Sequence, residues 1–238
     1  MIEGLSQYLH HQPVLTLLVI CHLLSDYHLQ SQTIADHKGE NLIYLGYHLV
    51  GVGIPLLIFT TIMPKLWWLS LLVFVSHALI DWMKPQVARW LKGKNVGLFL
   101  LDQCLHLVII VFASHRLVVT DFPNWLDHRL LSTILFSLIV TKPTNIVFKI
   151  FFSKYQPDQD QKIDTIAGAG ATIGILERIV IGICMVMGQF ASIGLVFTAK
   201  SIARYNKISE SPSFAEYYLI GSLFSILSVF IAAWICFF

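Results

Sequence analysis

The chain has 238 residues, of which 56% are hydrophobic and only 13% are charged. A soluble domain carries about 25% charged residues, so this composition excludes an ordinary water-soluble globular protein. A mean hydropathy of +0.71 indicates that most of the chain lies in lipid. The net charge of +2 is too small to favour nucleic acid as a partner, and the lipid bilayer is the expected environment.

Seven segments approach the roughly 20 apolar residues that a transmembrane helix needs. They cover residues 13–30, 42–62, 66–84, 96–115, 125–141, 168–199 and 213–237. The expected fold is therefore an all-α transmembrane helical bundle with about seven spans. Pro64 separates the second segment from the third, and Lys142-Pro143 predicts an end or a kink of the fifth.

One clearly hydrophilic stretch, SKYQPDQDQKIDT at 153–165, interrupts this series of apolar segments. We expect it to separate a five-span amino-terminal membrane domain, residues 1–152, from a two-span carboxy-terminal membrane domain, residues 166–238. The four cysteines lie singly in apolar segments without CxxC spacing. The sequence therefore indicates neither a disulfide framework nor a thiolate metal site.

The distribution of Lys and Arg predicts the orientation, because short cytoplasmic loops carry the excess of these residues. If the seven segments alternate, nine cations lie on one side: Lys38, Lys84, Arg89, Lys92, Lys94, Lys142, Lys149, Lys154 and Lys162. Six lie opposite, namely Lys65, Arg116, Arg129, Lys200, Arg204 and Lys207, and Arg178 lies inside the sixth segment. We therefore expect the amino terminus outside the cytoplasm and the carboxy terminus inside it.

Three of the first four segments contain a histidine and an aspartate four residues apart. These pairs are His22 and Asp26 in CHLLSD, His77 and Asp81 in HALID, and Asp102 and His106 in DQCLH. Residues at i and i+4 of a helix lie on one face, one turn apart. Each pair therefore presents two polar groups to the same neighbouring helix.

The order of the two residues is reversed in the third pair. The first and third segments are expected to run toward the cytoplasm and the fourth away from it, so only a reversed motif presents the same groups at the same depth. At about 1.5 Å of rise per residue, His22, His77 and His106 share one level to within roughly a turn. With His48 of the second segment, four imidazoles and three carboxylates are expected to converge near the cytoplasmic side.

Imidazole and carboxylate together suit a divalent metal such as zinc, manganese, iron or nickel, and helical bundles commonly hold such ions between facing helices. The candidate metal ligands are His22, Asp26, His48, His77, Asp81, Asp102 and His106. Seven groups exceed the three or four that one catalytic zinc takes. The pattern therefore predicts either two metal ions or aspartates that orient the ligating histidines.

Other interpretations of the same residues remain open. Buried ionisable groups in a membrane also form proton or cation pathways, and a transporter or channel is the principal alternative function. Interhelical hydrogen bonding in a membrane scaffold is a third hypothesis. Haem held between two histidines would leave the aspartate at every fourth position unexplained.

Glu177 and Arg178 interrupt the apolar run of the sixth segment. Adjacent helical residues point about 100° apart, so each requires a partner on another helix. Glu177 could act beside the metal as ligand or general base, with Arg178 binding an anionic substrate group. An interhelical ion pair that joins the two halves of the chain is an equally weighted alternative.

The residues HLLSDYHLQ, HALIDWMK and FLLDQCLH, together with His48, resemble an uncharacterised family of bacterial integral membrane proteins. The carboxy-terminal run ILERIVIGICMVMGQF and the segment FAEYYLIGSL are similar to longer members of that family. The resemblance implies a multi-pass protein of the bacterial inner, or cytoplasmic, membrane. In style of motif, but not in exact spacing, the chain is also similar to inner-membrane metal-dependent hydrolases.

The sequence thus leads to one hypothesis about function. A divalent metal, most simply zinc, would activate water for hydrolysis of a lipid-linked or membrane-associated substrate. The residues expected to act in catalysis are Asp102, Glu177 and Arg178.

Overall fold

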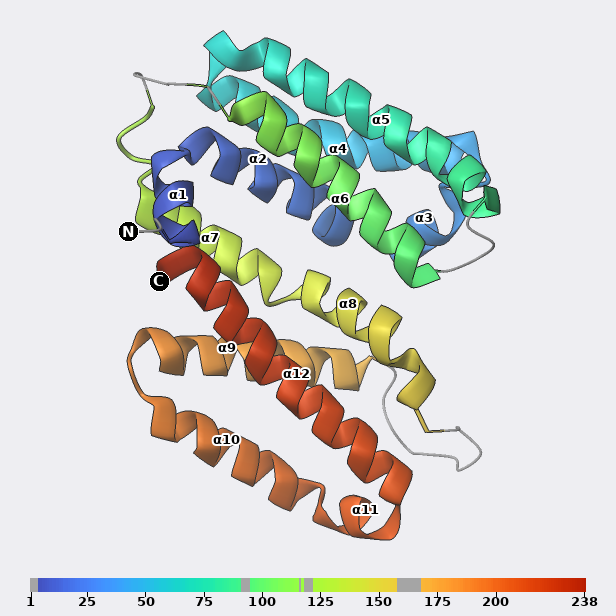
Figure 1. Ribbon diagram of the computed structural model, residues 1–238, viewed down its shortest axis with the longest axis vertical. Helices are drawn as coiled ribbons and strands as arrows, with labels where there is room; N and C mark the ends of the chain where they lie inside the picture. The colour runs from blue at the N-terminus through green and yellow to red at the C-terminus, as the bar shows by residue number, and fades with distance from the viewer. Residues whose placement is uncertain (1–3, 91–94, 116, 118–121, 158–167) are drawn as a thin grey trace. The chain divides into compact units, whose positions relative to one another are not determined.

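The computed structural model describes residues 4–90, 95–115, 117, 122–157 and 168–238 (Figure 1). Every regular element within these ranges is a helix, which confirms the expected all-α fold. The chain divides into two compact units, Met1–Leu138 and Ile139–Phe238. The expected hydrophilic linker lies largely in 158–165, outside the described residues.

The amino-terminal unit contains the helices that carry the three histidine and aspartate pairs. Its helices are α1 (Leu5–His11), α2 (Pro13–Leu23), α3 (Gln32–His37), α4 (Leu42–Ile62), α5 (Trp67–Trp90), α6 (Asn95–Ser114) and α7 (His128–Ile139). Helix α2 packs against α4 and α6, and α5 packs against the same two helices. The four helices therefore enclose one interior, in which Leu18, Phe59 and Leu69 are completely buried.

Local capping residues fix where several of these helices begin. The Ser31 hydroxyl accepts a hydrogen bond from the Ile34 amide at α3, and the Asn41 side chain accepts one from the Ile43 amide at α4. Such caps satisfy amide groups that have no partner within the helix. They also set the position of Lys38, which lies in the turn between α3 and α4.

Among the described residues, six helical segments are long and apolar enough to cross a membrane. They are Leu42–Ile62, Pro64–Trp90, Val96–Ser114, His128–Tyr155, Ala169–Val186 and Pro212–Phe237, with shorter apolar helical segments at Pro13–Leu29 and Phe190–Ala203. This agrees approximately with the expected seven spans and identifies a multi-pass membrane protein.

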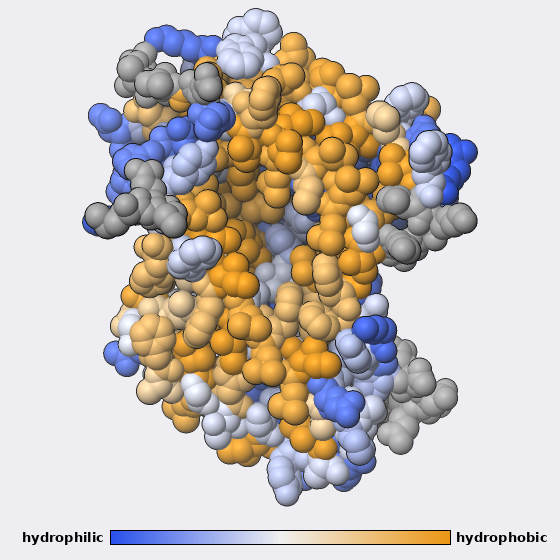
Figure 2. All heavy atoms as spheres, in the orientation of Figure 1, coloured by the Kyte–Doolittle hydropathy of each residue, from blue (hydrophilic) through white to orange (hydrophobic). Residues whose placement is uncertain are grey.

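Large hydrophobic side chains cover the outward faces of these helices. Leu57, Val108 and Phe112, on α4 and α6, are 67%, 63% and 86% exposed. On the face in Figure 2, hydrophobic residues cover the helices and hydrophilic residues gather near helix ends. Lipid is the solvent that such a surface requires, because water would leave this apolar area unburied.

The carboxy-terminal unit contains α8 (Lys142–Phe152), α9 (Ala169–Val186), α10 (Phe190–Ala203), α11 (Tyr205–Glu210) and α12 (Pro212–Phe237). The helical segment that begins with α7 does not stop at Lys142-Pro143. It breaks at Thr141, whose φ of −96° and ψ of −114° are not helical, and resumes with proline in the first turn of α8. The predicted end or kink is therefore a kink.

The single span expected at 168–199 is wrong, because the structure forms two helices there. Helix α9 ends at Val186, and Gly188 has a φ of +69°, a conformation that favours glycine. Helix α10 then packs back along α9, as Figure 1 shows. A continuous helix of that length would have exceeded the roughly 30 Å of a bilayer core. The expected domains, 1–152 and 166–238, stay a prediction.

The turn at Gly188 changes the expected topology. Because α10 turns back along α9, we expect Lys200, Arg204 and Lys207 on the side that we expect to be cytoplasmic. The excess of positive charge on that side increases, in agreement with the positive-inside rule. Helix α12 then carries the carboxy terminus across, so we expect Phe238 on the same side as the amino terminus.

Fusion of a reporter to Phe238 tests this topology. A reporter that is active only outside the cytoplasm should be active there, and a matched reporter that requires the cytoplasm should be inactive. A fusion after Tyr205, at the start of α11, serves as control and should give the opposite pattern. Cytoplasmic activity at Phe238 would contradict the topology.

Candidate metal centre

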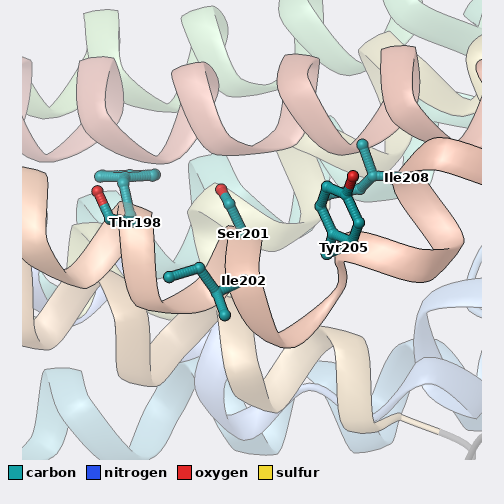
Figure 3. A pocket seen from close by; sticks show the side chains of 6 residues that line it. Thr198, Ser201, Ile202, Tyr205 and Ile208 are labelled. Carbon is teal, nitrogen blue, oxygen red and sulfur yellow. The ribbon is translucent and has the colours of Figure 1, made fainter.

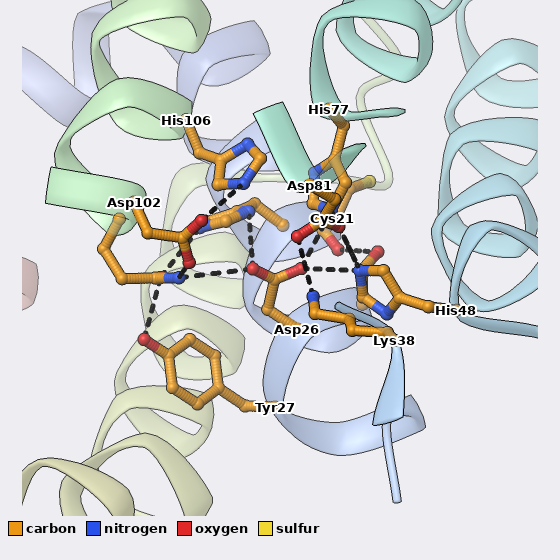
Figure 4. A network of polar contacts seen from close by, with 12 residues as sticks. Cys21, Asp26, Tyr27, Lys38, His48, His77, Asp81, Asp102 and His106 are labelled. Atoms are coloured by element: carbon orange, nitrogen blue, oxygen red, sulfur yellow. Dashed lines mark hydrogen bonds and ion pairs between the residues drawn. The ribbon is translucent and has the colours of Figure 1, made fainter. Parts of the chain in front are cut away.

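The structure brings together all seven residues that the sequence predicted as metal ligands (Figure 4). His22 comes from the end of α2, Asp26 from the turn that follows it, His48 from α4, His77 and Asp81 from α5, and Asp102 and His106 from α6. None of the seven is more than 7% exposed. Four segments of the amino-terminal unit therefore place imidazoles and carboxylates in one buried cluster.

Asp26 lies in a π-helical turn, Leu24–Leu29, which directly continues α2. In such a turn the backbone is wider than in an α-helix, and single π turns are frequent at functional sites. The expected contact between i and i+4 is retained, with 3.9 Å between His22 Nδ1 and Asp26 Oδ2. Asp26 Oδ1 faces away from α2 and toward α4 and α5.

Asp26, His48 and His77 form a compact set of three donor atoms. Asp26 Oδ1 lies 3.2 Å from His77 Nε2 and 3.6 Å from His48 Nε2, and the two imidazole nitrogens lie 3.1 Å apart. Ligands at 2.0 to 2.2 Å from a tetrahedral zinc are about 3.3 to 3.6 Å from one another. These three atoms therefore have nearly the spacing of one face of a zinc coordination shell.

Asp81 contacts the same two imidazoles. Its Oδ2 lies 2.9 Å from His48 Nε2 and 3.3 Å from His77 Nε2. If each neutral ring donated its one N–H to one carboxylate, the two Nε2–H groups would face each other 3.1 Å apart with no acceptor between them. A shared cation accommodates this arrangement.

His22 and His106 add two further donor atoms to the cluster. Within the part of the chain that the structure describes, His22 Nδ1 and His106 Nε2 are buried without a hydrogen-bond partner. The nearest carboxylate oxygen to His106 Nε2 belongs to Asp102, 3.8 Å away. Buried polar nitrogen atoms usually have a partner, so these two are available to bind an ion or a water molecule.

Two lysines that the sequence analysis considered only for topology belong to the cluster. Lys38 Nζ lies 2.9 Å from Asp81 Oδ1, and Lys84 Nζ lies 2.8 Å from Asp102 Oδ2. The Lys38 side chain is only 8% exposed and that of Lys84 is 28% exposed. Each ammonium group compensates one buried carboxylate, which would otherwise be costly inside the bundle.

Gln103 is a second group that the sequence analysis missed. Its amide nitrogen donates to Asp26 Oδ2 and Asp102 Oδ2, both at 3.3 Å. Its amide oxygen accepts a hydrogen bond of 2.8 Å from the Tyr27 hydroxyl and lies 3.2 Å from His22 Nε2. Gln103 thus connects the aspartates of the π turn and of α6 and orients them.

Glu177 and Arg178 lie in the carboxy-terminal unit, and their described contacts are within that unit. Glu177 Oε2 lies 2.7 Å from Lys200 Nζ of α10. Arg178 donates to the backbone oxygens of Val140 and Thr141 and to the Asn145 side chain, at the kink before α8. These contacts stabilise helix packing, and the expected catalytic role of both residues stays a prediction.

An open pocket of about 370 Å³ lies on α10 and α11 (Figure 3). It is lined by Phe197, Thr198, Ser201, Ile202, Tyr205 and Ile208. None of the seven cluster residues belongs to this pocket, so it gives no information on access to them.

The family model for "Protein of unknown function (DUF3307)" matches residues 14–135. The chain belongs to the DUF3307 family. No curated protein and no solved structure matches it. The DUF3307 match includes all seven cluster residues, Lys38, Lys84 and Gln103, and it ends before Glu177. The expected resemblance to an uncharacterised family is confirmed, and the candidate site lies within the part of the chain that defines the family.

The ion pair between Lys38 and Asp81 leads to a prediction about stability. In metal-free protein, Asp81→Leu should lower the free energy of unfolding by about 3 kcal/mol, because the buried Lys38 ammonium loses the carboxylate beside it. Thermal unfolding in detergent measures the effect. The double variant Lys38→Met, Asp81→Leu should recover much of the loss, and Asp36→Asn, at an exposed position, should stay within about 0.5 kcal/mol of the wild type. An Asp81→Leu protein as stable as the wild type would show that this pair does not contribute.

Proposed function

We propose that the amino-terminal unit binds a divalent metal ion, zinc in the simplest case, and uses it to hydrolyse a membrane-associated substrate. We place the protein in the cytoplasmic membrane of a bacterium, with the site near the cytoplasmic face. The observation that carries the proposal is the set of donor atoms of Asp26, His48 and His77, which lie 3.1 to 3.6 Å from one another in the interior of the bundle.

Interhelical hydrogen bonding alone explains this arrangement less well. Polar contacts between membrane helices contribute only about 0.6 kcal/mol on average, and one such contact needs one donor and one acceptor. Here two carboxylates approach the same pair of imidazole nitrogens, while His22 Nδ1 and His106 Nε2 have no hydrogen-bond partner among the described residues. Six polar side chains that converge inside an otherwise apolar helical bundle are more typical of an ion site.

The residues divide naturally into two groups by their contacts. Asp26, His48, His77 and Asp81 supply the closely spaced donors that would hold the ion. A divalent ion held by these residues would activate water for hydrolysis and polarise the bond to be broken. We assign the transfer of the proton of the reacting water to Asp102 and His106 of α6, because they border Asp81 in the same cluster.

Gln103 and the two lysines have supporting roles in this scheme. Gln103 holds Asp26 and Asp102 in fixed orientations through its two donated hydrogen bonds. Such contacts orient ligands and tune their affinity for metal. Lys84 is the most exposed charged group of the cluster, and therefore marks the side from which a substrate can approach.

A cation transporter is the second candidate, and the two lysines are the observation that favours it. The ammonium groups of Lys38 and Lys84 form ion pairs with Asp81 and Asp102, as a transported cation would. Ionisable residues on membrane helices commonly line such pathways.

Metal content tests the first part of the proposal. The full chain, purified without chelators, should contain stoichiometric zinc or another divalent metal by elemental mass spectrometry. His77→Ala should reduce the content at least tenfold, because it removes the donor shared by the closest contacts. His37→Ala, at an exposed histidine whose ring nitrogen bonds the Thr33 backbone oxygen of its own helix, is the matched control and should retain the metal. Metal-free wild-type protein would overturn the proposal.

The second part concerns the reaction. Zinc-loaded protein in vesicles of bacterial lipid extract should generate new lipid species, detected by mass spectrometry, and Asp102→Asn should abolish them. Zinc entry into vesicles that contain a zinc-sensitive dye, lost in Asp102→Asn and without change in the lipids, would support transport instead.

A further inference from the structure

Two ammonium groups reach the buried cluster from the same end of the bundle. Lys38 lies in the turn that precedes α4, and Lys84 lies on α5 about one turn closer to the helix end than Asp81. In Figure 4 the Lys38 side chain extends into the cluster beside Asp26 and His48. Both groups therefore stand between the metal donors and the membrane interface that we assign to the cytoplasm.

The fixed charges of the cluster show which kind of ligand it can accept. Apart from its histidines, the cluster contains five charged side chains among the described residues: Asp26, Asp81, Asp102, Lys38 and Lys84. Three carboxylates and two ammonium groups leave one negative charge when the imidazoles are neutral. One bound divalent ion converts this into one positive charge. An uncompensated charge is costly in a dry interior, so the loaded centre, with neutral water at the metal, favours an anionic ligand.

The geometry also allows the lysines to bind that anion. Asp81 contacts the imidazoles through Oδ2 and Lys38 through Oδ1, so the carboxylate can face an ion and the lysine simultaneously. Each ammonium group has three N–H donors, so it can pair with its carboxylate and still donate to a ligand. Two ammonium groups on separate segments can both donate to a phosphate, which offers several charged acceptor oxygens.

The surroundings of the site indicate how such a phosphate would arrive. The outward faces of α4 and α6 are apolar, with Leu57, Val108 and Phe112 strongly exposed. Lys84 is partly exposed in the last third of α5, on the side of the bundle where a lipid headgroup would lie. An amphiphile can place its chains along the helices and its phosphate at the lysines, whereas a soluble anion gains nothing from the apolar faces.

Building on the proposed metal-dependent hydrolysis, we propose that the substrate of this centre is a phosphate ester carried by a lipid, and that Lys84 and Lys38 bind its phosphate.

Binding to the zinc-loaded full chain in uncharged detergent tests the proposal without requiring turnover. The probes are phosphatidic acid, inorganic phosphate and diacylglycerol, with affinities measured by titration calorimetry. We expect phosphatidic acid to bind most tightly, and Lys84→Gln to weaken it at least about tenfold through loss of a charge-assisted hydrogen bond. Lys84→Arg should retain most of the affinity. Arg89→Gln, which removes an exposed cation from the same end of α5, should change it less than about twofold.

Zinc content of each variant separates this proposal from the one on which it depends. If the wild type holds no metal, the metal centre itself fails. If wild-type and Lys84→Gln proteins hold equal zinc and bind phosphatidic acid equally, the anion site is overturned while the metal centre stands. Binding of inorganic phosphate as tight as that of phosphatidic acid would overturn the lipid part. A loss of zinc in Lys84→Gln with unchanged affinity per loaded molecule would show that Lys84 serves only to position Asp102.

Discussion

Three carboxylates within a bundle of apolar helices impose the constraint on which the rest of the amino-terminal unit depends. A carboxylate that is removed from water must be neutralised or paired, and each of Asp26, Asp81 and Asp102 is at most 7% exposed. The surrounding structure meets this demand with two ammonium groups, four imidazoles and the Gln103 amide. These groups come from five segments of the chain, which explains why α2, α4, α5 and α6 must pack in one register.

The same constraint connects structure to the proposed chemistry. A protein that needed only helix packing could replace buried ion pairs by apolar side chains at little or no cost in stability. The cluster instead combines metal-ligand types at ligand spacing, donor atoms without hydrogen bonds and lysines on the accessible side. In the function that we propose, a divalent ion would satisfy the donors, and an anionic substrate would then balance the charge. Metal binding and substrate binding would both follow from one electrostatic requirement.

The sequence was sufficient to predict the parts of the site that are pairs of histidine and aspartate within single helices. Spacing of four residues and its reversal between antiparallel segments brought His22, His77, Asp102 and their partners to one level, and the structure confirms that they converge. The lysine pairs could not be predicted in this way, because Lys38 reaches Asp81 from a turn between helices and Lys84 reaches Asp102 across a helix interface. Gln103 was missed since a residue adjacent to Asp102 points about 100° away, and only its long side chain brings the amide back.

The turn at Gly188 was hidden by a continuous run of apolar residues, in which one positive φ reverses the chain.

Anomalous diffraction from crystals of the zinc-loaded protein, recorded at the zinc absorption edge, tests the central claim most directly. We expect a peak among Asp26, His48, His77 and Asp81, about 2.0 to 2.2 Å from imidazole nitrogen and carboxylate oxygen atoms. The claim would be contradicted if the zinc peaks lay only at surface histidines such as His37, or if other sites were fully occupied and the bundle showed no peak.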